Sequence, residues 1–172
     1  MKVKPRKLFV LVGYPHSGKR LMLHHLFNRK NFFPHKAPIY APGFDSGKFV
    51  VINITNYSNS TADYLNRIND VLERHTDTNT SFMILMSLIF DGRAHDIKKV
   101  LEYLNRTSYE LHYLVLTSSY YDQEPMKEQD LEQLRRFITK GRIHLFDTLV
   151  TQSSLRFKQR RDEVAKLISD IV

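Results

Sequence analysis

The chain has 172 residues, of which 42% are hydrophobic, and a net charge of +8, which suits one domain with a single substantial core and permits an anionic partner. It contains no cysteine, so disulfide bonds, thiolate metal sites and a cysteine nucleophile are excluded. No apolar run approaches the roughly 20 residues that a membrane-spanning helix needs, and the apolar stretch after the basic N-terminus is too short for a signal peptide.

The basic side chains are spread along the chain and form no single stripe with interleaved aromatic residues. A nucleic-acid partner is therefore not expected. We expect a single domain over residues 1–172, located in the cytoplasm and without a transmembrane segment.

The first predicted element is a strand over Leu8–Val12, followed by a tight loop and a helical pattern that begins at Lys19. The segment spells Gly13-x-x-x-x-Gly18-Lys19, the spacing of a phosphate-binding loop in the strand–loop–helix context that the motif requires. In such a loop the backbone N–H groups and the helix N-terminus face a phosphate, and the lysine neutralises its outer oxygens. The predicted nucleotide-binding residues of this segment are Gly13, Tyr14, Pro15, His16, Ser17, Gly18, Lys19 and Arg20. For His16, a contact with phosphate and a space-filling role both stay open.

Position 20 departs from the motif, because a Ser or Thr hydroxyl that holds Mg²⁺ is expected there and this chain has Arg20. A guanidinium cannot ligate a metal, and it brings a fixed positive charge to that place. Two interpretations stay open. Either Arg20 contacts a phosphate as an internal cation, so that nucleotide binds without metal, or it points to solvent and the loop is an empty strand-to-helix turn.

Two strands are predicted after the first helix, over Ala37–Ala41 and Lys48–Thr55. They are joined only by the six residues Pro42 to Gly47, whereas a parallel crossover takes about a dozen or more. We therefore expect an antiparallel hairpin, which at this place is typical of GTPases of the Ras and septin class.

The rest of the chain alternates apolar, strand-like runs with amphipathic helical periodicity. Further strands are predicted over Phe82–Phe90, Leu111–Leu116 and Ile143–Phe146. Helices are predicted around Leu65–Leu72, Ile97–Leu104, residues 125–140 (with Pro125 as the start signal and Gly141 as the stop signal) and Val164–Ile171. This alternation predicts the α/β class, and specifically a three-layer P-loop NTPase fold with a mostly parallel sheet and one antiparallel strand.

Two groups of charged residues have alternative interpretations. Asp91 would be the general base or metal anchor of a kinase-like site, or the cap of the next helix, which we favour. A late basic cluster would be a phosphate-clamping lid of a kinase or, as its position before an amphipathic helix favours, a solvated or partner-facing surface: Arg156, Lys158, Arg160 and Arg161.

Aromatic and imidazole side chains give weaker signals. Tyr120 and Tyr121 could stack on a base, but aromatic residues after a strand more often form the edge of a core. His24 and His25 are neighbours on a helix and project about 100° apart, so they do not chelate one ion.

The second half of the chain carries short motifs in a characteristic order. An apolar strand leads into Gly92-Arg93 and a helix, a later strand ends at Thr117 with Asp122 after it, and Gly141-Arg142 precedes Phe146-Asp147. In this order and spacing the chain resembles the immunity-associated (GIMAP-type) GTPases, a septin-related family, and the resemblance covers most of the chain at low identity. It implies GTP or GDP as ligand, with Thr117 and Asp122 in the segment that contacts the base.

The chain departs from that family where the family carries Asp-Thr-Pro-Gly, because it has Asn53-Ile54-Thr55-Asn56 there. An amide offers no charge to Mg²⁺, and Asn56 lacks the conformational freedom of glycine. Together with Arg20, both protein contributions to a metal are lost, and no water-positioning residue or arginine finger is evident nearby.

The sequence therefore predicts a degenerate GTPase-like module that binds GTP or GDP with weak or no hydrolysis and acts through a protein partner or self-association. We assign no catalytic and no metal-binding residues, and Mg²⁺ is not expected as a cofactor. The alternative is an active P-loop phosphotransferase that uses ATP, Lys19, Asp91 and the late arginines. Antiparallel pairing of the strand Phe49–Ile54 with its predecessor favours the GTPase lineage, and a parallel strand with Asp91 beside the loop favours a kinase.

Overall fold

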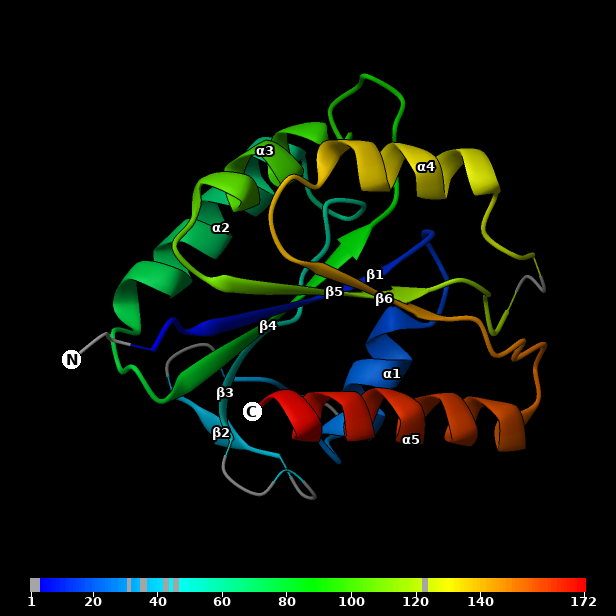
Figure 1. Cartoon of the computed structure of the whole chain (residues 1–172), viewed down its shortest axis with the longest axis horizontal. Coiled ribbons are helices and arrows are strands. Elements are labelled where there is room, and N and C mark those ends of the chain that lie inside the picture. The colour runs from blue at the N-terminus through cyan, green and yellow to red at the C-terminus, as the bar shows by residue number, and fades with distance from the viewer. Residues whose placement is uncertain (1–3, 31, 35–36, 42–43, 45–46, 122–123) are drawn as a thin grey trace.

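The structure is a computed structural model that describes residues 4–30, 32–34, 37–41, 44, 47–121 and 124–172 (Figure 1). Helices and strands alternate along nearly the whole of this part of the chain. The elements in chain order are β1 (Lys7–Gly13), α1 (Lys19–Leu26), β2 (Ile39–Tyr40), β3 (Lys48–Ile52), α2 (Thr61–Arg74), β4 (Thr80–Ser87), α3 (Lys98–Arg106), β5 (Glu110–Leu116), α4 (Glu128–Phe137), β6 (Arg142–Phe146) and α5 (Ser154–Ile171).

The strands form one six-stranded sheet in the order β2-β3-β4-β1-β5-β6. All neighbouring pairs are parallel except β2 and β3, in which Ile39 lies opposite Phe49 and Tyr40 opposite Lys48 in antiparallel register. The predicted hairpin and the predicted α/β class are thus both confirmed.

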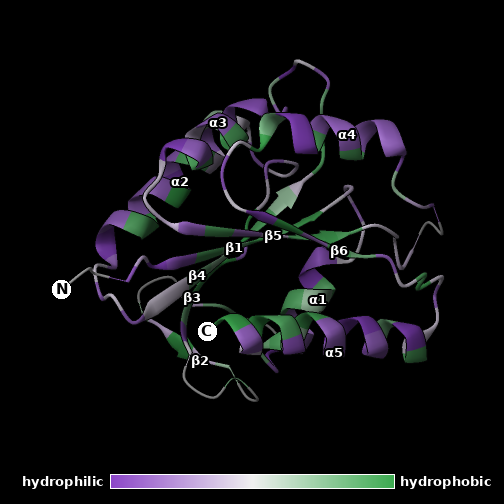
Figure 2. Cartoon of the chain, in the orientation of Figure 1, coloured by the Kyte–Doolittle hydropathy of each residue, from purple (hydrophilic) through white to green (hydrophobic). Residues whose placement is uncertain are grey.

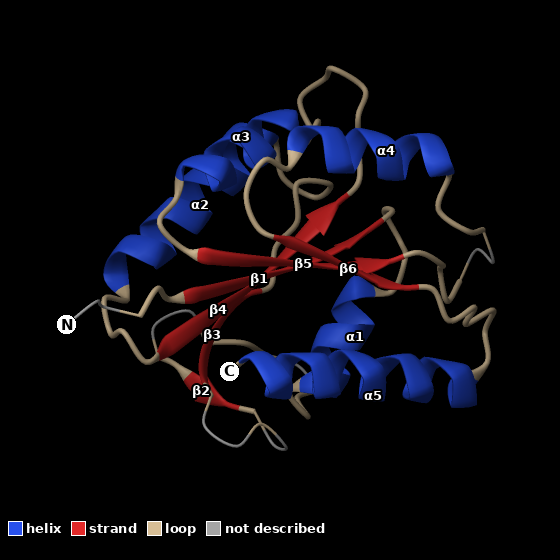
Figure 3. Ribbon diagram, in the orientation of Figure 1, coloured by secondary structure: helices blue, strands red, loops and turns tan. Residues whose placement is uncertain are grey.

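Helices cover both faces of the sheet, with α2, α3 and α4 on one face and α1 and α5 on the other (Figures 1 and 3). Alternate residues of β1 enter the two cores: Leu8, Val10 and Val12 face the first group of helices, and Phe9 and Leu11 face the second. Every residue of β1 is buried, because a central parallel strand is covered on both sides. Figure 2 shows the same division in the helices, which turn apolar residues toward the sheet and polar residues outward.

The connections of β1 and β4 leave the sheet in opposite directions. From β1 the chain passes through α1 to β2 and β3, and from β4 it crosses β1 through α3 to reach β5 on the other side. The two connecting helices lie on opposite faces, so the carboxyl ends of β1 and β4 form the switch point of the sheet. In open α/β sheets this switch point is where ligands bind.

Several predicted boundaries are corrected. β3 ends at Ile52 rather than Thr55, and β4 ends at Ser87 rather than Phe90. Pro125 does not start α4, because it forms an isolated β-bridge with Ser118. Within the described ranges, no helix has the length and apolarity that crossing a membrane would need.

Candidate phosphate-binding site

The loop between β1 and α1 is a tight turn that depends on its two glycines. The Ser17 N–H donates to the Tyr14 carbonyl at 3.0 Å and closes the turn. A Cβ at Gly13 would lie 2.4 Å from the Ser17 Oγ, so the Ser17 side chain would have to shift to admit a larger residue. Gly18 has φ of 87°, which favours glycine, and His16 also has a positive φ, of 60°. The chain thus leaves the strand, reverses and enters α1 within five residues.

Lys19 is the buried cation of this loop, with only 5% of its surface exposed. Its Nζ donates to the carbonyl oxygens of Gly13 at 3.1 Å and Tyr14 at 2.7 Å, and to the Ser17 Oγ at 3.4 Å. Burial, and then the charge of Arg20, lower the pKa of Lys19 to about 7. The ammonium therefore lies close to losing its proton at neutral pH.

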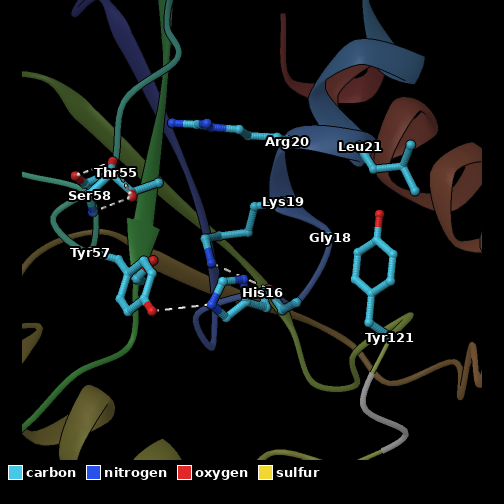
Figure 4. A pocket seen from close by; sticks show the side chains of 11 residues that line it. His16, Gly18, Lys19, Arg20, Leu21, Thr55, Tyr57, Ser58 and Tyr121 are labelled. Atoms are coloured by element: carbon cyan, nitrogen blue, oxygen red, sulfur yellow. Dashed lines mark hydrogen bonds between the residues drawn. The ribbon is translucent and has the colours of Figure 1, made fainter.

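The loop borders a pocket of about 320 Å³ at the carboxyl edge of the sheet (Figure 4). Its walls come from residues 16–21, from Thr55, Tyr57 and Ser58 after β3, from Ser87 at the end of β4, and from Tyr121 after β5. The lining includes two basic side chains, Lys19 and Arg20, and no carboxylate among the residues that the structure describes. Such a pocket favours an anion.

Arg20 occupies a different side of the pocket from Lys19. Its side chain is exposed and extends from α1 toward the Thr55–Ser58 segment, whereas the Lys19 side chain turns back to the loop (Figure 4). Arg20 belongs to α1, and within the described residues its guanidinium forms no hydrogen bond or ion pair. Of the two sequence-based interpretations, neither is decided, because Arg20 both lines the pocket and is exposed to solvent.

His16 and Tyr57 meet across the pocket. The His16 Nε2 lies 3.2 Å from the Tyr57 hydroxyl, and the two rings pack edge to face with centroids 5.1 Å apart. This contact connects the loop to the segment after β3 and borders the opening of the pocket (Figure 4).

The segment Asn53–Asn56 has a structural role that its sequence does not reveal. Asn56 is fully buried, and its Nδ2 donates to the carbonyls of Ser87 and His95, each at 2.9 Å, while its Oδ1 accepts from the Ser87 N–H at 2.8 Å. Asn56 thus ties the segment after β3 to the end of β4. In the sheet, β4 lies between β1 and β3. The strand next to β1 on this side is therefore β4, which ends at Ser87, and not β3, which Asn53 follows.

Not all of the predicted loop residues line the pocket. His16, Ser17, Gly18, Lys19 and Arg20 do, whereas Gly13 and Tyr14 contribute the carbonyls that hold Lys19, and Pro15 is not part of the lining.

The Tyr14 side chain faces α4. Its hydroxyl donates to the Asp130 carboxylate and accepts from the Lys127 N–H at 2.9 Å. Burial, and then the Asp130 contact, raise the pKa of Tyr14 to about 12. Tyr14 therefore fixes the loop to the first turn of α4.

Of the predicted base-binding segment after β5, only some residues line the pocket. Thr117 does not line the pocket, because its Oγ1 donates to the Phe146 carbonyl at 3.1 Å and joins the ends of β5 and β6. Asp122 lies outside the described residues. Tyr120 packs against Phe157, as expected of a core edge, but Tyr121 is 51% exposed and lines the pocket.

Two further assignments are corrected. Asp91 does not cap α3: its Oδ1 accepts from the Arg93 N–H, and the residue that accepts from the first turn, at Lys98 N, is Asp96. Arg160 does not belong to a basic surface, because it is fully buried and its guanidinium donates to the Ser118 carbonyl at 2.6 Å.

Sequence reasoning named Thr55 only as part of a degenerate motif, and it missed Tyr57, Ser58 and Ser87 as pocket residues. The available signal was their position, since residues at or beyond the carboxyl ends of parallel strands gather at the ligand-binding edge.

The chain matches no protein-family model, no curated protein and no solved structure. Within the described residues, no group of three or more His, Cys, Asp or Glu side chains is placed to hold a metal ion. The chemistry of the pocket is therefore what indicates its ligand.

Proposed function

We propose that this protein is a nucleotide-binding module that holds the phosphates of GTP or GDP on the loop from Gly13 to Arg20, hydrolyses them weakly or not at all, and acts in the cytoplasm through a protein partner or self-association. The observation that carries the proposal is the buried Lys19 ammonium beside a pocket whose described lining has a second cation and no carboxylate. An anion is the ligand that compensates both charges.

A bound phosphate would replace the present hydrogen-bond acceptors of the Lys19 Nζ. Lys19 donates to two carbonyls and a hydroxyl, which are neutral acceptors, and a phosphate oxygen is a stronger acceptor for a charged donor. The first N–H groups of α1 lie at the same place and favour negative charge. A contact between Lys19 and phosphate contributes about 1.5–3 kcal/mol, or roughly a 10- to 150-fold gain in affinity.

The donor set does not fit Mg²⁺. The polar side chains of the described lining are hydroxyl groups, the His16 imidazole, Lys19 and Arg20, whereas Mg²⁺ is usually bound through one or two carboxylates. Without a divalent ion the developing charge of phosphoryl transfer lacks its main stabilisation. Weak or absent hydrolysis follows.

The phosphotransferase alternative gains no support from the positions of its residues. Asp91 is exposed and does not line the pocket, and Arg160 is fully buried, with its Nη1 donating to the Ser118 carbonyl. The antiparallel pairing of β2 and β3 agrees with the GTPase-like hypothesis, and the sheet order places β4 rather than β3 beside β1.

Calorimetric titration with GTP, GDP and ATP, each in EDTA and in Mg²⁺, tests the proposal. Wild-type protein is expected to bind without metal, and Lys19→Ala is expected to lose at least about tenfold in affinity. Lys99→Ala on α3 removes the same charge from an exposed position outside the pocket and is the matched control. Absence of nucleotide binding, or strictly Mg²⁺-dependent binding with phosphate release, would refute the proposal.

A further inference from the structure

The two cations of the pocket are held apart by helix geometry. Lys19 and Arg20 are consecutive residues of α1, so their side chains leave the helix about 100° apart. The Lys19 Nζ is bound by the loop carbonyls, and the Arg20 side chain extends toward the opposite wall (Figure 4). A single phosphate on the loop therefore leaves the Arg20 guanidinium without a partner.

The wall that Arg20 approaches is rich in hydroxyl groups. The Thr55 Oγ1 and Ser58 Oγ lie 3.2 Å apart, and the Ser58 N–H donates to the Thr55 Oγ1 at 3.3 Å, which fixes a compact turn. The Tyr57 hydroxyl turns instead toward His16, with the His16 Nε2 3.2 Å away. Hydroxyl groups donate to phosphate oxygens, and a guanidinium binds them in bidentate fashion.

We infer that the pocket holds a phosphate chain of at least two units, with one phosphate on the loop at Lys19 and the next between Arg20 and the hydroxyls of Thr55 and Ser58. This inference rests on the proposed function and adds to it the residues that hold the second phosphate. Arg20 supplies the positive charge between the phosphates that a divalent ion would otherwise supply. Binding is consequently independent of metal.

The volume is consistent with this ligand class. A pocket of about 320 Å³ lies at the lower end of the range for small-molecule sites, roughly 300–1,000 Å³. It spans from the loop at the end of β1 to the segment after β3, across the end of β4, where Ser87 forms part of the floor. A phosphate chain laid along this direction passes both cations.

Titration with inorganic phosphate, pyrophosphate and tripolyphosphate in EDTA tests the inference. Pyrophosphate is expected to bind at least about tenfold more tightly than phosphate, because it gains a charge-assisted contact. Arg20→Ser, which restores the hydroxyl of the phosphate-loop motif, is expected to lower pyrophosphate affinity about tenfold and to leave phosphate affinity within about twofold. Arg67→Ser on the exposed side of α2 makes the same change outside the pocket and is the control.

The outcomes separate this inference from the proposed function. If phosphate and pyrophosphate bind equally well, if Arg20→Ser leaves pyrophosphate binding unchanged, or if pyrophosphate binds only with added Mg²⁺, the two-phosphate site is refuted while a phosphate-binding loop stands. If none of the three anions binds, and GTP and GDP do not bind either, both proposals fall. Because Arg20 is exposed and unpaired within the described residues, its replacement is not expected to unfold the protein.

Discussion

The lowered pKa of Lys19 makes a quantitative prediction about proton uptake on ligand binding. With a pKa of about 7, only about a tenth of the empty protein carries the Lys19 proton at pH 8. A bound phosphate stabilises the charged form and raises this pKa, so binding at pH 8 should take up about 0.9 proton per site. At pH 7 the uptake should fall to about 0.5, since half of the lysines are already protonated.

Calorimetry in phosphate-free buffers of different ionisation enthalpy measures this uptake directly. With GTP or GDP as the ligand, work at pH 8 keeps the terminal phosphate deprotonated, because the second pKa of a phosphate ester lies near about 6. The affinity should fall by up to about tenfold per pH unit above pH 7, because Lys19 must then be protonated at increasing cost. Lys19→Arg carries a charge that does not titrate and should abolish the uptake, while Lys99→Ala should preserve it.

An uptake below about 0.2 proton at pH 8, with binding intact, would refute the reasoning. It would mean either that Lys19 is already charged in the empty pocket or that the ligand does not contact it. Equal uptake in wild type and Lys19→Arg would assign the proton to another group.

Three further predictions concern stability and the shape of the loop. Gly13→Ala places a methyl group 2.4 Å from the Ser17 Oγ, so it should destabilise the protein by about 1–3 kcal/mol in urea denaturation and weaken phosphate binding. Asn56→Ala removes three buried hydrogen bonds and should lower the free energy of unfolding by about 3 kcal/mol, measured in the same way. Burial lowers the pKa of both His112 and His144, whose rings share a hydrogen bond; the unfolded chain therefore binds more protons, and stability should fall as pH drops below about 6.5.

Each of these has a distinguishing control. For the loop, Gly92→Ala adds a methyl group that meets no atom within 4 Å; it bears only the strain of a positive φ and should leave phosphate binding unchanged. For Asn56, a loss below about 0.5 kcal/mol would show that water replaces its partners. For the histidine pair, His144→Gln should flatten the loss of stability between pH 7 and pH 5, and an unchanged slope would assign it to other groups.

Much of the architecture could be predicted because it depends on local signals. The strand–loop–helix unit at Lys19 follows from an apolar run, two glycines and a helical pattern, and the hairpin follows from a connection too short for a crossover. The helix around Ile97–Leu104 follows from periodicity alone, and Val100, Leu101 and Leu104 are all fully buried in α3.

The parts that could not be predicted depend on the order of strands in the sheet. The hydrophobic periodicity of the sequence does not predict that β4 lies between β1 and β3. This strand order places Ser87 beside the loop and allows Asn56 to form hydrogen bonds with Ser87. The burial of Arg160 could not be predicted either, because a charged residue on an amphipathic helix normally faces water. Its carbonyl partner, Ser118, is distant in sequence.

The charge of Arg20 affects the protonation of Lys19 in the pocket before a ligand binds. Two fixed cations next to each other, with no carboxylate among the described lining residues, would repel and destabilise the unliganded loop. A Lys19 that gives up its proton near neutral pH relieves this repulsion while keeping its hydrogen bonds to the loop carbonyls. Under the proposed function, the ligand then restores the charge as it binds, so Arg20 both lowers the proton affinity of Lys19 in the empty protein and holds the second phosphate in the complex.

Arg20→Ser should therefore raise the pKa of Lys19 and reduce the proton uptake on phosphate binding at pH 8. An uptake that does not change in this variant would show that the two side chains act independently.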